Sequence, residues 1–439
     1  MLLLGVGMIF GLIGAIQYII PGYLKTYLSF EKVRPLHVSS VIFWILFGAT
    51  GGVLTYLQEH TGRPLYSSLL AKTQLFIFAI TTLIVLVSYV AGSFGGREYW
   101  EFNPVLALPI VVGWILFIIN VTRTAKSWKG QPVYWWMWLT GAVFFLFTFL
   151  ESYLWVFPYF RENIINDMTV QWKSYGSMVG AWNMLLYGSS IYLMGKISGD
   201  QSYGHSKIAF LLYFTGLFNL MFNWGHHIYT LPTLHLIKNI SYAVSMTELF
   251  IFGRIIFLWQ KSLTTAMKHY HHMAYRFLVA SEVWVFLSLL LAIAMSIPAI
   301  NVYTHGTHIT VAHTMGATIG INSFLILAFA FDILNNSCVN FDCFKSQFNK
   351  AFWLSNISLF IFWLSLIAAG ILKSSWMMRA DRTPFAAMVY SLQPYFEVFM
   401  ISGLFLLSGI LLILYLMLKN QLRCYFRQVL GRNISDSSI

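Results

Sequence analysis

Four histidines lie within segments that are otherwise apolar. His37 stands in RPLHVSSVIFWILFG, the adjacent His226 and His227 lie near the end of FNLMFNWGHHIYTLP, and His313 lies in YTHGTHITVAHTMGATIGIN. A histidine in an apolar membrane segment usually marks a ligand, a proton relay or a gate. We therefore interpret these residues as candidate ligands. The alternative, for each histidine considered by itself, is a structural role in which the ring packs in the core and is held by a hydrogen bond.

The pair His313 and Met315 gives the clearest geometric signal. The two residues are two positions apart, so on a helix their side chains point about 200° apart. One helix can therefore present a ligand to each of two pockets. Imidazole and thioether are both axial ligands of haem iron, and the pair raises the reduction potential. The chain has 18 methionines, so Met315 as core filler is the alternative.

The adjacent His226 and His227 are a second candidate. On a regular helix neighbouring side chains diverge by about 100°. At a helix end loosened near Gly225, however, two imidazoles can converge on one metal ion. The run KHYHH at 268–272 lies in a basic loop, so we interpret it as a solvated surface.

Composition places these residues in a membrane. Of 439 residues 58% are hydrophobic and 10% are charged, whereas about 25% are charged in soluble domains. A water-soluble enzyme is thereby excluded. Apolar runs of about 20 residues are long enough to cross a hydrocarbon layer of ~30 Å as helices. They predict an all-α bundle of about twelve spans, near 2–20, 36–57, 69–92, 104–121, 134–157, 170–195, 207–227, 235–258, 273–299, 308–332, 351–372 and 390–418.

The spans follow one another with short polar breaks, which predicts a single integral-membrane domain over 1–439 with a cytoplasmic tail at 420–439. The net charge of +12 resides largely in loops beside the spans, so nucleic-acid binding is not expected. The distribution of lysine and arginine among the loops favours cytoplasmic N- and C-termini. Because no C-x-x-C-H motif is present, the chain is predicted to carry no covalent c-type haem.

Five motifs occur in a characteristic order along these spans: RPLHVSSVIFWILFG, GREYWEFNP, WGHHIYTLP, SMTELFIFGR and THGTHITVAHTMG. Together they resemble the large catalytic subunit of cytochrome-c-type nitric oxide reductase, in the haem–copper oxidase superfamily. The resemblance runs from about Gly5 to about Lys419. It implies a bacterial cytoplasmic-membrane enzyme that reduces two NO to N₂O, with two haem b groups and non-haem iron. It also implies a small membrane-anchored c-type cytochrome subunit as electron donor.

The resemblance assigns roles residue by residue. It implies that His37 is an axial ligand of the low-spin haem and that His313 is the proximal ligand of the high-spin haem. It implies that His226 and His227 bind non-haem iron, with Glu248 near this dinuclear centre.

The loop at 95–101 is implied to lie beside the haem propionates. Glu98 and Glu101 match glutamates at that place, and the counterpart of Glu98 helps to hold calcium. Arg97 can pair with a propionate as a bidentate donor. In the predicted orientation this loop and His37 lie at the outer face, so we expect electrons to enter there.

The sequence departs from the family pattern at the metal sites. Tyr175 and Val179 stand where a third iron-binding histidine and a glutamate are expected. Asn183 stands in place of a further glutamate, and Met315 in place of the second low-spin histidine. A phenolate can replace an imidazole as a hard ligand, but valine supplies no carboxylate. We therefore predict that His37 and Met315 ligate the low-spin haem and that Tyr175 lines the dinuclear pocket as a ligand or through a water.

Three classes of function remain open at this point. The first is a divergent nitric oxide reductase subunit. The second is a superfamily member with another role, namely O₂ reduction, NO dismutation, electron transfer or gas sensing. The third is a haem-free transporter that uses the intramembrane histidines and Glu248 as an ion path. The transporter leaves the arrangement of His313 and Met315 unexplained.

Overall fold

The computed structural model describes residues 1–125, 127–246, 256, 260, 261, 264, 272–335 and 344–430, and the regular structure of these residues is helical. The α-helices are α1 (Leu2–Ile19), α2 (Phe30–Thr61), α3 (Ser68–Val90), α4 (Ala107–Thr124), α5 (Val133–Glu151), α6 (Pro158–Arg161), α7 (Ile164–Ser198), α8 (Lys207–Phe222), α9 (His235–Ser245), α12 (His272–Ser296), α13 (Pro298–Thr304), α14 (His308–Met315), α15 (Phe324–Asn335), α16 (Lys345–Met378), α17 (Phe385–Ser391) and α18 (Gln393–Leu430). The short 3₁₀ turns are η1 (Pro104–Leu106), η2 (Leu154–Val156), η3 (Gln201–His205) and η4 (Asn223–Ile228), and η5 (Gly316–Ser323) is a π-helix.

The described residues include ten helical segments that are long and apolar enough to cross a membrane. Each of the ten overlaps one of the predicted spans. The predicted span at 170–195 lies in α7, a 35-residue helix whose buried side carries serine and glycine. The predicted span at 235–258 begins as α9 and extends outside the described residues. The predicted all-α membrane bundle is confirmed, and the chain is a multi-pass membrane protein.

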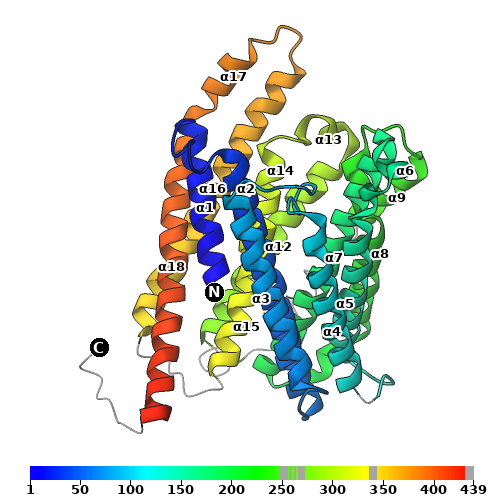
Figure 1. Cartoon of the computed structure of the whole chain (residues 1–439), viewed down its shortest axis with the longest axis vertical. Helices are drawn as coiled ribbons and strands as arrows, with labels where there is room; N and C mark the ends of the chain where they lie inside the picture. The colour runs from blue at the N-terminus through cyan, green and yellow to red at the C-terminus, as the bar shows by residue number, and fades with distance from the viewer. Residues whose placement is uncertain are drawn as a thin grey trace.

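The helices form a bundle in which α2, α12, α14 and α15 lie between two outer groups (Figure 1). On one side α1 packs against α2 and α18, and α16 packs along α18. On the other side α5 packs along α7, which also contacts α8. Large apolar side chains are exposed on the outside of α3, among them Leu75, Phe76 and Leu83. Such a surface fits the hydrocarbon interior of a membrane.

The helix that carries His313 is held tightly against α12. It runs from α14 through the π-helix η5 into α15. A Cβ atom at Gly320 would lie 2.4 Å from Cγ of Trp284, and one at Gly316 would lie 2.7 Å from Oγ of Ser288. Only glycine permits this approach, so α14 and η5 are fixed relative to α12.

A partly buried group of ion pairs joins three helices at one end of the bundle. Lys196 of α7 donates to Glu59 of α2 at 2.9 Å and to Asp332 of α15 at 2.8 Å. Tyr192 donates to Glu59 and Tyr56 donates to Asp332, both at 3.2 Å. We call these five residues the Lys196 cluster. The cluster lies at the opposite end of α2 from the loop at 91–103.

Candidate functional site

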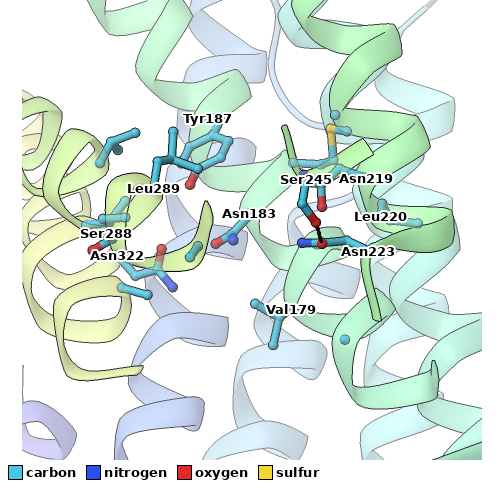
Figure 2. Close-up of a pocket in the computed structure, with 18 of the residues that line it drawn as sticks. Val179, Asn183, Tyr187, Asn219, Leu220, Asn223, Ser245, Ser288, Leu289 and Asn322 are labelled. Carbon is cyan, nitrogen blue, oxygen red and sulfur yellow. Dashed lines mark hydrogen bonds between the residues drawn. The ribbon is translucent and has the colours of Figure 1, made fainter. Parts of the chain in front are cut away.

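A cavity of about 210 Å³ lies between α7, α8, α12 and the helix formed by α14 and η5. His226 and His313 both line this cavity, which we call the histidine cavity. In Figure 2 the side chains of Ser288, Leu289 and Asn322 lie on the opposite side from those of Asn219, Asn223 and Ser245. The structure thus brings two of the predicted ligands, 87 positions apart in the sequence, to one site.

Asn223 orients the ring of His226. Nδ1 of His226 lies 3.0 Å from Oδ1 of Asn223, and that oxygen also accepts a hydrogen bond from Oγ of Ser245. Because an amide oxygen can only accept, the proton of the neutral imidazole resides on Nδ1. The lone pair of His226 is therefore on Nε2, and a partner of this kind is typical of metal-binding histidines.

His227 is held by aromatic rings. Its ring centroid lies 4.2 Å from that of His226 and 4.5 Å from that of Trp172, which stacks on it at an interplanar angle of 9°. The ring of His305 lies 5.8 Å away. Within the described residues Nδ1 of His227 is buried without a hydrogen-bond partner. The sequence did not identify Trp172 or His305, although Trp172 lies one helical turn before Gly176 of the cavity wall.

The two histidines lie in a 3₁₀ turn that follows the end of α8. Asn223–Ile228 form the 3₁₀ turn η4. A Cβ atom at Gly225 would lie 2.8 Å from Cβ of Ser241 in α9. Glycine is therefore required here for close packing against α9, and the two imidazoles lie side by side at this departure from the regular helix.

His313 and Met315 lie on different sides of their helix, as their spacing predicts. His313 lines the histidine cavity, whereas Met315 is not among the lining residues and packs half-buried against the apolar core. Within the described residues, Nδ1 of His313 and Oγ of Ser288 are buried and lack hydrogen-bond partners. Oδ1 of Asn183 is likewise buried and lacks a hydrogen-bond partner among the described residues.

These atoms without hydrogen-bond partners bear on whether the histidine cavity could hold a haem or a metal ion. Buried polar atoms in proteins are almost always hydrogen-bonded. Here several of them surround one cavity whose wall also carries two imidazoles. The cavity therefore has the polar character of a binding site, and its two imidazoles are donors that a haem iron or a metal ion would take.

His37 lies in a separate position between α1 and α2. Its Nδ1 lies 2.7 Å from the carbonyl oxygen of Gly7, to which it donates. A Cβ atom at Gly11 would lie 2.8 Å from the same nitrogen, so the glycines of α1 make room for the ring. The hydrogen bond leaves Nε2 of His37 with the lone pair, as a haem ligand requires.

The structure does not bring Tyr175 to the histidine cavity. Tyr175 is absent from the lining residues, and its buried ring packs edge-on against Tyr99 with centroids 5.3 Å apart. The next residue, Gly176, does line the cavity, and the side chains of neighbouring residues on an α-helix diverge by about 100°. The side chain of Tyr175 packs instead against the loop at 91–103.

That loop is fixed by ion pairs. Arg34 pairs with Glu98 and, at 3.0 Å, with Glu101. Arg97 pairs with Asp167 at 2.7 Å. Burial raises the pKa of Glu101, while the charge of Arg34 opposes this shift. The sequence singled out Arg97 and Glu98 but missed Arg34, which lies three residues before His37 and bridges both glutamates.

The described residues supply few metal ligands beyond the imidazoles. They contain no group of three or more histidine, cysteine, aspartate or glutamate side chains placed to hold a metal ion. Val179 lines the histidine cavity, so the carboxylate expected from the family at this position is absent. Glu248 lies outside the described residues, and its expected role near the dinuclear centre stays a prediction.

We predict that Arg34→Gln destabilises the protein more at high pH than at low pH. The variant leaves Glu98 and the mostly buried Glu101 facing each other, which raises the pKa of Glu101 further. A carboxyl whose folded pKa is raised binds more protons folded than unfolded, so stability falls as pH rises from about 4.3 through the folded pKa. Melting temperatures at about pH 5 and about pH 8 measure the effect. Arg161→Gln is the exposed control, and equal losses at both pH values would contradict the prediction.

Known proteins resemble this chain over most of its length. The family Cytochrome C and Quinol oxidase polypeptide I matches residues 1–405. A nitric oxide reductase subunit of Stutzerimonas stutzeri is 25% identical over 94% of this chain and 91% of that protein. A cbb3-type cytochrome c oxidase subunit of the same organism is 22% identical over 88% of this chain and 85% of that protein. A solved heme-copper terminal oxidase matches the fold with a TM-score of 0.72 at 15% identity, over 96% of this chain and 82% of that chain.

Proposed function

We propose that this chain, which belongs to the family Cytochrome C and Quinol oxidase polypeptide I, is the gas-reducing subunit of a membrane oxidoreductase whose substrate is nitric oxide. The match confirms the superfamily that the sequence motifs resemble, and members of this family carry haems and a metal site. The observation that carries the proposal is the meeting of His226 and His313 in one cavity.

We assign the haems and the metal to residues of this chain. His313 would hold the high-spin haem at the histidine cavity, and His37 with Met315 would hold the low-spin haem. His226 and His227 would hold a non-haem iron, with Asn223 fixing the tautomer of the first. When bound, haem iron accepts electrons and binds a diatomic gas.

The chain's own side chains provide binding, orientation and shielding. Val179 and Leu289 give the histidine cavity apolar wall, which suits a small uncharged gas. Ser288 and Asn183 add polar atoms that can hold a water or a proton near the imidazoles. Tyr175 is better placed to support the loop at 91–103, because it packs against Tyr99.

We further propose that electrons enter from a membrane-anchored c-type cytochrome at the end of the bundle that carries the loop at 91–103. The ion pairs of Arg34 with Glu98 and Glu101 lie there. His37 follows Arg34 by three residues, so the low-spin haem would lie close to that face. This face is the outer face of a bacterial cytoplasmic membrane in the proposed orientation, in which both termini are cytoplasmic. Calcium at Glu98 stays a prediction, and in this structure one oxygen of that carboxylate pairs with Arg34.

One experiment on the purified membrane protein tests this function. Haem and total iron per chain are measured first, and N₂O production from NO is then followed with reduced c-type cytochrome or with quinol. Two haems, a third iron and N₂O formation support the proposal. A protein without haem refutes it. The similarity to cbb3-type oxidase makes O₂ reduction the second candidate, which O₂ consumption without N₂O formation would favour.

We predict that Met315→His lowers the reduction potential of the low-spin haem. Thioether ligation raises the potential relative to a second imidazole. The expected fall is on the order of 0.1 V, a fraction of the ~0.8 V range that axial ligands span. A spectroscopic redox titration measures it, with Met178→His, a buried methionine of α7, as control. An unchanged potential and spectrum in the Met315 variant would show that Met315 is not a ligand.

A further inference from the structure

Glu282 is a carboxyl group in the interior of the bundle. It lies ten residues into α12, about 15 Å from the start of this helix. Its exposed fraction is 6%, and among the described residues its Oε1 atom has no hydrogen-bond partner. An ionisable side chain within a membrane is energetically costly and usually functional. The haem and metal assignments above do not use it.

Hydrogen bonds connect Glu282 to the end of the bundle at which α12 begins. Tyr275, in the first turn of α12, donates to Oε1 of Gln260 at 3.0 Å. Nε2 of Gln260 donates to Oε2 of Glu282 at 3.2 Å. Tyr275 and Glu282 are seven residues apart, two helical turns, and therefore lie on one face of α12. The contacts therefore run from Glu282 to the first turn of α12.

Glu282 also lines a second, smaller cavity next to the histidine cavity. A small cavity of about 20 Å³ is lined by Glu282, Ser281, Ser190 and Tyr187. This volume is enough for about one water molecule. Tyr187 and Val285 line both this small cavity and the histidine cavity.

The same face of α12 continues along the histidine cavity. Val285, Ser288 and Ala292, which follow Glu282 by three, six and ten residues, all line that cavity. Glu282 therefore lies between the hydrogen bonds that lead to Tyr275 and the small cavity that adjoins the proposed gas-binding site.

We propose that Glu282 carries protons from the end of the bundle at which α12 begins to the histidine cavity. The inference rests on the proposed function, because reduction of the gas consumes protons there. In each cycle Oε1 takes one proton from a water molecule on the side of Tyr275 and releases one to a water in the small cavity, while Gln260 holds Oε2 and relays no proton. Only O–H bonds form and break, and no electron moves through the carboxyl. The end that supplies the protons is opposite to the end at which electrons enter.

Two variants separate a proton carrier from a structural carboxyl. Glu282→Gln keeps the size of the side chain and its hydrogen bonds but cannot carry a proton. Glu282→Asp keeps the carboxyl. Glu397→Gln, at an exposed position of α18, is the control. We expect Glu282→Gln to retain both haems and to lower steady-state gas reduction roughly 10-fold or more, whereas Glu282→Asp restores part of the rate.

Infrared spectroscopy gives a readout that needs neither haem nor substrate. A protonated carboxyl that exchanges with solvent shifts its C=O band when H₂O is replaced by D₂O. We expect this band in the wild type and in Glu397→Gln and its loss in Glu282→Gln. Absence of a Glu282-dependent band overturns the proposal, and so does a Glu282→Gln variant that turns over at the wild-type rate. If the wild type binds no haem, the proposed function fails, and the infrared band alone then decides whether Glu282 exchanges protons.

Discussion

Replacing His313 by alanine should leave a folded chain that binds one haem in place of two and no longer reduces the gas. His313 presents its ring to the histidine cavity from a helix that Gly316 and Gly320 hold against α12. No other histidine of α14 lines this cavity. We expect the activity to fall below about one-thousandth of the wild-type rate, because removing one member of a group of residues that act as a unit removes most of the rate enhancement. Haem per chain and N₂O formation measure the two losses.

His308→Ala is the matched control for this variant. His308 begins the same helix, but its ring packs against Tyr18 and Phe396 with centroids 6.2 Å and 5.0 Å away. It does not line the histidine cavity. The control should retain both haems and most of the activity. A His313→Ala protein with two haems and unchanged turnover would remove the basis of the haem assignment.

Replacing either His226 or His227 by alanine should abolish the non-haem metal. Among the described residues, η4 offers only these two imidazoles as metal ligands. Each variant therefore leaves a single imidazole for the metal. Loss of an outer hydrogen-bond partner typically costs 10-fold to 100-fold in metal affinity. We therefore expect metal affinity to fall more than about 100-fold when either histidine is replaced. We expect it to fall about 10-fold to 100-fold in Asn223→Ala.

Metal per chain and a titration with Fe²⁺ measure this loss of the non-haem metal. His235→Ala, an exposed histidine of α9, should bind metal as the wild type does. Undiminished iron in both His226→Ala and His227→Ala would show that the metal site is elsewhere or absent. Haem content should stay at two in all of these variants, which separates this result from that for His313.

The sequence predicted the membrane bundle well because crossing a hydrocarbon layer imposes a length and an apolar composition that can be read directly. It also predicted that His313 and Met315 face different sides, because they lie in the regular turns of α14 before η5 begins. Both inferences depend on the geometry of a single helix. They need no knowledge of how the helices pack.

Interactions between helices were harder to predict. Tyr175 was expected at the metal because it stands where the family has a third iron-binding histidine, and such a match does not fix the direction of a side chain in the folded bundle. Arg34 was missed because its partners, Glu98 and Glu101, are more than 60 positions away and meet it only after folding. Glu282 could have been noticed as a single carboxyl within an apolar run.

The Lys196 cluster has a consequence for the order in which the protein is assembled. Lys196 is synthesised 137 residues after Glu59 and 136 residues before Asp332. Chains emerge from the ribosome N-terminus first, so Lys196 and Glu59 enter the membrane while the helix with Asp332 is still to be made. The carboxyl of Asp332 is 1% exposed in the finished protein and needs the lysine as its partner. The cluster is therefore complete only after α15 has been made, and a chain released before α15 lacks the buried partner of Lys196.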